Sequence, residues 1–200
     1  ATREPMSVRS IVLRHYVAPL TYEEYLAANA GKADDTANVQ PVKIEAETPD
    51  YQSDESIYPL TDRTSAITSP QDPKLQILNF MGGTENFKTV GQWVEYEFEV
   101  EADGFYTIAM LSKQNDMSGM FASRTLYIDG EIPFAECTSL RFDYSKDWNC
   151  ESVTDGTTDF KFYLTKGTHT LRLEVSLGQF AEVISTVESS LTKINNCYLD

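Results

Sequence analysis

The side chains in this sequence that could do chemistry are mostly carboxylates, and they follow no catalytic spacing. The chain has 31 Asp and Glu residues against 16 Lys and Arg, which gives a formal net charge of −15. A glycosidase needs only two paired carboxylates, so one such pair among this many acids carries no information. The sequence contains no Gly-x-Ser-x-Gly elbow, no Cys–His pairing with an orienting third residue and no phosphate-binding glycine loop. We therefore expect a protein that is not an enzyme.

The histidines and cysteines do not form a metal-ligand pattern either. Two histidines are too few for a His-based metal site, and the three cysteines include no Cys-x-x-Cys pair. Cys137 and Cys150 bracket one loop and could form a disulfide in an exported protein. The net charge of −15 repels nucleic-acid phosphates and anionic lipid, and no apolar run is long enough to span a bilayer. We therefore expect neither nucleic-acid binding nor membrane insertion.

Alternation of apolar and polar residues predicts that β-strands form most of the chain. Over 94–101 the apolar residues alternate with glutamates, so one strand face is apolar and the other is acidic. The same alternation over 42–47 predicts the first strand of the domain, and over 160–175 it predicts two further strands joined as a hairpin. Asp129-Gly130 is a turn signal, because both residues tolerate positive φ. We interpret 91–134 as an antiparallel meander.

Two helices and a polar linker set the predicted domain organisation. Thr21 and Glu24 form a capping box, which predicts a short helix over 22–29. Apolar residues at helical spacing predict a longer helix over 179–197. This helix either docks on the β domain or belongs to a further helical segment. The predicted organisation is an extension over 1–41, a β-sandwich domain over 42–177 and a C-terminal helix over 178–200.

Long irregular loops separate the predicted strands. They cover 51–73, 113–123 and 142–159. Loops of this length inside a compact domain often carry function. The third loop contains Tyr144, Trp148 and Asn149. The alternative is that Trp148 packs under its loop as part of a satellite core.

Several motifs resemble those of the galactose-binding-like carbohydrate-binding modules of families 6 and 35. In chain order, they are Ile44-Glu45-Ala46-Glu47, the strand Trp93–Tyr96, Gly104-Phe105-Tyr106-Thr107-Ile108 and Gly167-Thr168-His169-Thr170-Leu171-Arg172-Leu173. The resemblance implies a mainly β fold, a galactose-binding-like jelly-roll β-sandwich with a short N-terminal and a long C-terminal helix. It also implies a sugar site in which Tyr144 and Trp148 stack on the ligand and Asn149 binds its hydroxyls.

The resemblance further implies a calcium site. Glu45 and Glu47 match the calcium-holding glutamates of these modules. Calcium takes six to eight oxygen ligands, so two carboxylates alone cannot complete a site. The alternative is a solvated strand edge. The modules close with an Asp-bearing strand, whereas here the last predicted strand runs directly into the helix over 179–197.

Three further segments are similar to the N-terminal region of large extracellular family 1 solute-binding proteins of Firmicutes ABC sugar importers. They are Tyr22-Glu23-Glu24-Tyr25-Leu26, the stretch from Arg124 to Phe134, and the stretch from Leu173 to Gly178. This similarity implies export and a cell-surface location in a Gram-positive bacterium. We therefore expect a non-catalytic, carbohydrate-associated module, with a carbohydrate, a solute-binding domain or a permease as partner. The alternative is a structural or protein-interaction domain that has no sugar site and orients a solute-binding domain or contacts a partner.

Overall fold

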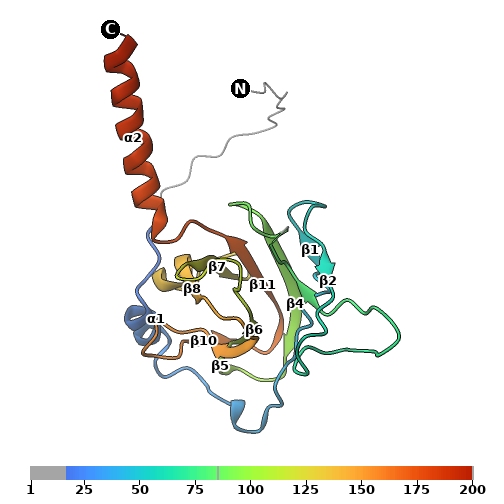
Figure 1. The fold of residues 1–200 in the computed structure, drawn as a ribbon. Helices are drawn as coiled ribbons and strands as arrows, with labels where there is room; N and C mark the ends of the chain where they lie inside the picture. Colours follow the sequence, from blue (N-terminus) through green and yellow to red (C-terminus); the bar gives the residue numbers. More distant parts are fainter. Residues whose placement is uncertain (1–16, 85, 200) are drawn as a thin grey trace, which may run out of the picture.

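The computed structural model describes residues 17–84 and 86–199 and shows a β-sandwich with a helix near each end of the described chain (Figure 1). Residues 1–16 of the predicted extension lie outside the described residues. The helices are α1 (Tyr22–Asn29), α2 (Phe180–Leu199) and the short 3-10 turns η1 (Thr36–Asn38) and η2 (Ala135–Ser139). The strands are β1 (Tyr51–Gln52), β2 (Pro59–Leu60), β3 (Phe80–Met81), β4 (Trp93–Val100), β5 (Gly104–Thr107), β6 (Ala109–Ser112), β7 (Phe121–Ile128), β8 (Leu140–Asp143), β9 (Asn149–Ser152), β10 (Lys161–Leu164) and β11 (Gly167–Val175).

The two layers of the sandwich share one hydrophobic core. One layer is a five-stranded antiparallel sheet in the order β1-β4-β11-β7-β8, and the other consists of the pairs β10–β5 and β6–β9. Val94, Leu126 and Leu171 from the large sheet belong to the same buried cluster as Phe160 and Phe162 from the second layer. The predicted fold class, mainly β with a short N-terminal and a longer C-terminal helix, is confirmed.

The sheet topology corrects two predicted strand connections. The meander over 91–134 does not form, because β4 pairs with β1 and β11 whereas β5 pairs with β10. The hairpin over 160–175 does not form either, since β10 and β11 lie in different sheets. The physical reason is that alternation shows which side chains face the core, and both layers face the same core. The chain crosses between layers at Gly104, where φ is +152° and a Cβ would collide with the Asp34 carboxylate.

The strand predicted over 42–47 is also absent. Residues 41–45 have no regular structure, and a turn follows in which the Thr48 N–H donates to the Glu45 carbonyl at 3.3 Å. The segment is flanked by Pro41 and Pro49, which cannot donate to a strand ladder. The edge of β4 is covered instead by β1.

Helix α1 is an integral part of the sandwich. Its capping box forms as predicted. The buried Tyr22 ring lies 4.9 Å from Phe134 and 4.7 Å from Phe160, measured between ring centroids. The hydroxyls of Tyr22 and Tyr25 accept hydrogen bonds of 2.9 and 2.7 Å from two backbone N–H groups of β10. The helix thereby covers an edge that would otherwise be free to pair with another chain.

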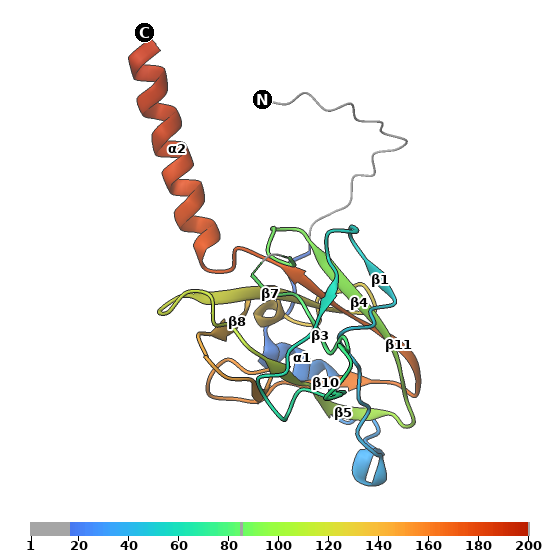
Figure 2. The same cartoon turned by 45° about the vertical axis from the view of Figure 1, so that its right-hand side comes forward.

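Helix α2 projects away from the sandwich (Figures 1 and 2). The helix predicted over 179–197 is confirmed, and at its base the Phe180 ring stacks on Phe121 at 4.8 Å. Beyond this contact its apolar side chains are exposed, and Ile194 reaches 66% exposure. Within the described part of the chain, no helix is both long and apolar enough to cross a membrane.

The buried imidazole of His169 lies between two hydrogen-bond acceptors. Its Nδ1 lies 2.7 Å from the Asp129 carboxylate, and its Nε2 lies 2.6 Å from the Thr165 carbonyl. Burial lowers the pKa of His169, but the hydrogen bonds to Thr165 and Asp129 and the charge of Asp129 together raise it above the ordinary value. Only the protonated ring can donate to both acceptors.

We expect the stability contributed by His169 to fall as pH rises. Because the folded pKa is raised, this contribution is fully present below the unfolded pKa of about 6.5 and is lost as pH rises through the folded pKa. The melting temperature measured from pH 6 to 9 should therefore decline more steeply for the natural chain than for His169→Gln. Parallel declines in the two proteins would contradict the assignment.

Candidate functional site

The three long loops meet at one side-chain cluster, which we call the loop junction and define as Asp62, Lys113 and Trp148. The Lys113 Nζ lies 2.9 Å from the Asp62 Oδ2. The Trp148 Nε1–H donates to the same oxygen at 2.6 Å. Each loop supplies one residue, so a single carboxylate oxygen fixes the three loops relative to one another.

Strand register explains why two of these residues meet. In the β6–β9 pair, Ser112 lies opposite Asn149, so the next rung would place Lys113 opposite Trp148. The ammonium of Lys113 accordingly lies 5.2 Å from the centre of the Trp148 ring. Phe80, at the start of β3, packs edge-on against the same indole at 5.4 Å.

Asp62 is held in a dense hydrogen-bond network. Its side chain is 8% exposed, and that of Lys113 is 17% exposed. The Asp62 Oδ1 accepts hydrogen bonds from the Thr64 N–H at 2.7 Å and from the Thr64 hydroxyl at 2.6 Å. Burial by itself would raise the pKa of Asp62, but the hydrogen bonds from Thr64, Lys113 and Trp148 outweigh it and lower the pKa well below its usual range. Asp62 is therefore ionised at neutral pH.

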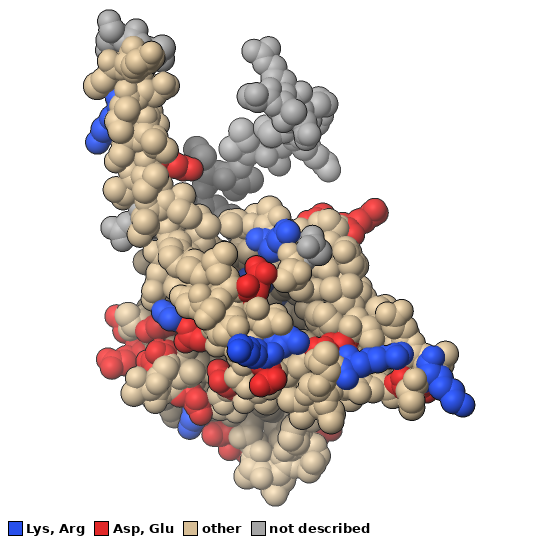
Figure 3. Space-filling view, in the orientation of Figure 1, with Lys and Arg blue, Asp and Glu red and all other residues tan. Residues whose placement is uncertain are grey.

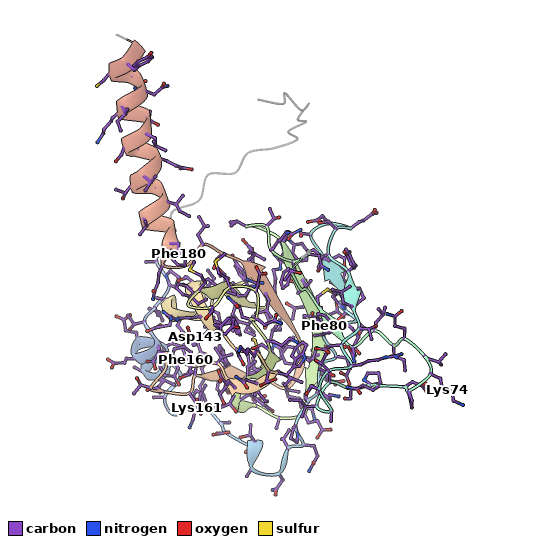
Figure 4. The ribbon with its side chains drawn as sticks, in the orientation of Figure 1. Lys74, Phe80, Asp143, Phe160, Lys161 and Phe180 are labelled. Atoms are coloured by element: carbon purple, nitrogen blue, oxygen red, sulfur yellow. The ribbon has the colours of Figure 1, made fainter. Side chains whose placement is uncertain are left out.

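Two hydrogen bonds between the Asp62 backbone and the Asn79 side chain form a clamp that closes the segment between these residues. The Asp62 N–H donates to the Asn79 Oδ1, and the Asn79 Nδ2 returns a hydrogen bond to the Asp62 carbonyl, both at 2.8 Å. In Figure 4, Lys74 lies at the outer end of the segment between β2 and β3, and Phe80 marks where the chain re-enters the sandwich. The clamp therefore fixes the base of the loop, while its outer end extends away from the core.

The predicted sugar-site residues differ in burial, and sugar binding by them stays a prediction. Trp148 is half-buried, and its only N–H is used by Asp62. Tyr144 is also half-buried. Asn149 is exposed at the start of β9, where its Nδ2 donates to the Ser145 Oγ at 3.0 Å. Because Asn149 pairs with Ser112 and Trp148 adjoins Lys113 on the next rung, the two side chains lie on opposite faces of the β6–β9 pair.

A groove lies on the Asn149 side of this strand pair. The Met110–Glu151 and Ser112–Asn149 rungs are two residues apart and therefore share a face. The groove has a volume of about 40 Å³. It is lined by Met110, Ser112, Leu140, Arg141, Phe142, Glu151, Ser152, Val153 and Thr154. No pattern in the sequence singled out these residues as a site. The available signal was the short alternation over 140–143 and 149–152, most of which fell within the predicted loop over 142–159.

Glu45 and Glu47 are both half-buried, and Glu45 forms an ion pair with Lys43 at 2.6 Å. Within 17–84 and 86–199, no cluster of three or more His, Cys, Asp or Glu side chains is arranged to hold a metal ion. Calcium binding by these two glutamates stays a prediction. Cys137 is buried, Cys150 is exposed, and both are free thiols.

Comparison with known proteins supports the fold. No protein-family model and no curated protein sequence matches the chain. Among solved structures, a Paenibacillus sp. cycloisomaltooligosaccharide glucanotransferase complexed with cycloisomaltoheptaose is similar, with a TM-score of 0.50 and 20% identity. The likeness covers 81% of this chain and 21% of that one. The chain thus spans about a fifth of that structure's length, and at this identity the likeness shows a shared fold.

Two other similar structures contain a family 35 carbohydrate-binding module by description. A Podospora anserina GH26-CBM35 β-(1,4)-mannanase has a TM-score of 0.48 and 9% identity, over 68% of this chain and 24% of that one. A family 35 carbohydrate-binding module from Clostridium thermocellum has a TM-score of 0.43 and 13% identity, over 61% of this chain and 80% of that one.

Proposed function

We propose that this chain is a non-catalytic carbohydrate-binding module and that its ligand lies across the face of β9, over a shallow groove that admits only part of a sugar ring. The observation that carries the proposal is the chemistry of the groove wall. Its lining combines the aromatic residue Phe142 with Arg141, Glu151, Ser112 and Ser152, and Glu151 and Ser112 face the same side of the β6–β9 pair. A sugar presents an apolar ring face and hydroxyls that both donate and accept, so it requires this mixture.

In this proposal the loop junction positions the site and does not itself contact the ligand. The Trp148 indole N–H donates to Asp62, and the ring packs against Phe80. Trp148 therefore fixes the segment that carries Tyr144 and Asn149. Fixing a loop before binding removes an ordering cost that would otherwise weaken affinity. Asn149 lies opposite the groove residue Ser112 on the same face of the strand pair. It is the candidate contact for a sugar hydroxyl.

The larger context in the proposal rests on the sequence motifs. The segments around Tyr22, Arg124–Phe134 and Leu173 are similar to those of importer solute-binding proteins. We propose that the module is exported, is displayed on a Gram-positive cell and is part of such a protein. Its sugar would then be related to the transported one.

A glycan-binding experiment tests the groove. We expect a plant or host glycan to shift the backbone NMR signals of β8 and β9. Glu151→Gln and Asn149→Ala should each weaken binding about tenfold, since a lost ligand hydrogen bond costs about 1–2 kcal/mol. Leu111→Ala is the matched control, because Leu111 is exposed on the other face of β6. A well-folded chain that binds no glycan, or one whose affinity is unchanged by the groove variants, would contradict the proposal.

A second candidate function is favoured by α2. Five of its exposed apolar residues recur at alternating spacings of three and four, a pattern typical of helix–helix packing. They are Ile184, Val187, Leu191, Ile194 and Tyr198. Figure 3 shows that most of the visible helix surface is uncharged. In this alternative the chain is an interaction domain that presents α2 to a helical partner. Rapid amide exchange along α2 in the isolated chain, followed by protection when a solute-binding domain is added, would support it.

A further inference from the structure

A second pocket lies where α1 meets β10, away from the groove on the β6–β9 pair. Its walls come from α1, from the turn that follows β7 and from β10 (Figure 1). It has a volume of about 200 Å³, compared with about 40 Å³ for the groove, and no residue lines both. An engineered apolar cavity of about 150 Å³ binds benzene, so this pocket has room for one ring with a short side chain.

The floor of the pocket is apolar and tightly packed. Phe162 and Leu164 are 1% and 4% exposed, and the Phe162 ring stacks on Phe134 with 5.4 Å between the ring centroids. Ile128 and Ile132 line the pocket and pack against the same hydrophobic core. The pocket is therefore formed by the fold itself, and a ligand that enters it does not have to order its walls.

Glu131 is the only charged residue among those that line the pocket. A tight turn holds it there, because its N–H donates to the Ile128 carbonyl at 3.0 Å and its carbonyl accepts from the Ile128 N–H at 2.9 Å. The other carboxylate of this turn, Asp129, is engaged by the His169 imidazole and the Thr170 N–H. Glu131 is exposed, so its carboxylate is the one that this turn offers to a ligand.

Two tyrosines complete the wall and favour a cation. The Tyr25 hydroxyl accepts a hydrogen bond of 2.7 Å from the Tyr163 N–H. Burial raises the pKa of Tyr163, and the negative charges of three aspartates raise it further. They are Asp103, Asp34 and Asp35. Lys32, which does not line the pocket, places its Nζ 4.5 Å from the centre of the Tyr163 ring. The potential at this wall is therefore negative, and the ring already attracts an ammonium group.

We propose that this pocket binds a small free ammonium compound that carries one apolar ring. The ring would pack against Ile128, Ile132 and Leu164, and the ammonium would pair with the Glu131 carboxylate. A neutral sugar fits less well, because the lining side chains offer its hydroxyls only one carboxylate and two tyrosine hydroxyls. An anion would be repelled by Glu131 and by the net charge of −15.

The test is an NMR titration of the full chain with 2-phenylethylammonium chloride. The methyl signals of Ile128, Ile132 and Leu164 should shift saturably, while the amide signals of β9 stay in place. 2-Phenylethanol has the same ring without the charge and should bind about two- to fivefold more weakly, the usual effect of an exposed ion pair. 3-Phenylpropionate, which carries the opposite charge, should bind more weakly still. Sodium chloride at about 1 M should remove most of these differences.

Glu131→Gln is the deciding variant, and its exposed position means that the fold should be unaffected. It should weaken 2-phenylethylammonium binding to the level of 2-phenylethanol and leave 2-phenylethanol binding unchanged. Glu99→Gln is the matched control, since it removes the same charge from an exposed position on β4 outside the pocket.

Two results would overturn the proposal. They are the absence of methyl shifts, and equal binding of 2-phenylethylammonium and 2-phenylethanol by the natural chain. Tighter binding of N-acetyl-lysine methylamide than of 2-phenylethylammonium would overturn the assignment to a free amine, because a lysine side chain has the charge but no ring. The groove on the β6–β9 pair has a separate lining, so failure of glycan binding there leaves these outcomes unchanged.

Discussion

Asp62→Ala should lower the free energy of unfolding by about 3–5 kcal/mol, the usual cost of removing one partner from a buried ion pair. The substitution leaves the Lys113 ammonium at 17% exposure without its carboxylate. It also removes the acceptor of the Trp148 N–H and of both Thr64 donors. Urea unfolding monitored by tryptophan fluorescence measures the loss. A change below about 1 kcal/mol would mean that the loop junction does not stabilise the fold.

Lys113→Met is the matched control for this effect. It should cost less than Asp62→Ala, because Asp62 keeps its hydrogen bonds from Thr64 and Trp148. The pH dependence gives a second check. The pKa of Asp62 is lowered on folding, so its contribution is present above the unfolded value of about 3.9 and is lost as pH falls through the folded value. The natural chain should therefore lose its stability advantage over Asp62→Asn in strong acid.

The loop junction also shows why the sequence indicated the loops but not the site. Length and composition singled out all three loops, and Asp62, Lys113 and Trp148 each lie in a different one. Their contact depends on sequence separations of 51 and 86 residues, which no local pattern encodes. The sequence around Trp148 fits both a ligand platform and a packing residue, because the partner of its indole N–H, Asp62, lies in a distant loop. The alternative in which Trp148 packs beneath its loop matches its half-buried position.

The strands illustrate the same distinction between local and non-local information. Alternation correctly placed Val94 and Tyr96 toward the core, because side-chain direction is a local property. Pairing partners are a non-local property, and the sequence neighbours β10 and β11 separate into different sheets. The groove residues were missed for this reason, since its walls come from β6, β8 and β9. Asp129-Gly130, by contrast, needs only local geometry, and both residues have the expected positive φ.

The docking of helix α1 on the sandwich depends on one aromatic side chain, that of Phe134. Phe134 is fully buried, and its ring centroid lies within 5.4 Å of those of four neighbouring rings. They are Tyr22, Tyr25, Phe160 and Phe162. We expect Phe134→Ala to lower the free energy of unfolding by about 3–5 kcal/mol, because the rigid rings around it cannot collapse into the cavity.

The same substitution should loosen α1 before the rest of the sandwich. Tyr22 and Tyr25 touch the Phe134 ring on one side and hold the β10 edge with their hydroxyls on the other. Hydrogen exchange should therefore accelerate in α1 and at the two β10 amides while β4 stays protected. Phe134→Leu, which retains most of the volume, should lose less stability and keep α1 protected. Uniform loss of protection across α1 and β4 would show that α1 has no separate docking step and unfolds only with the whole sandwich.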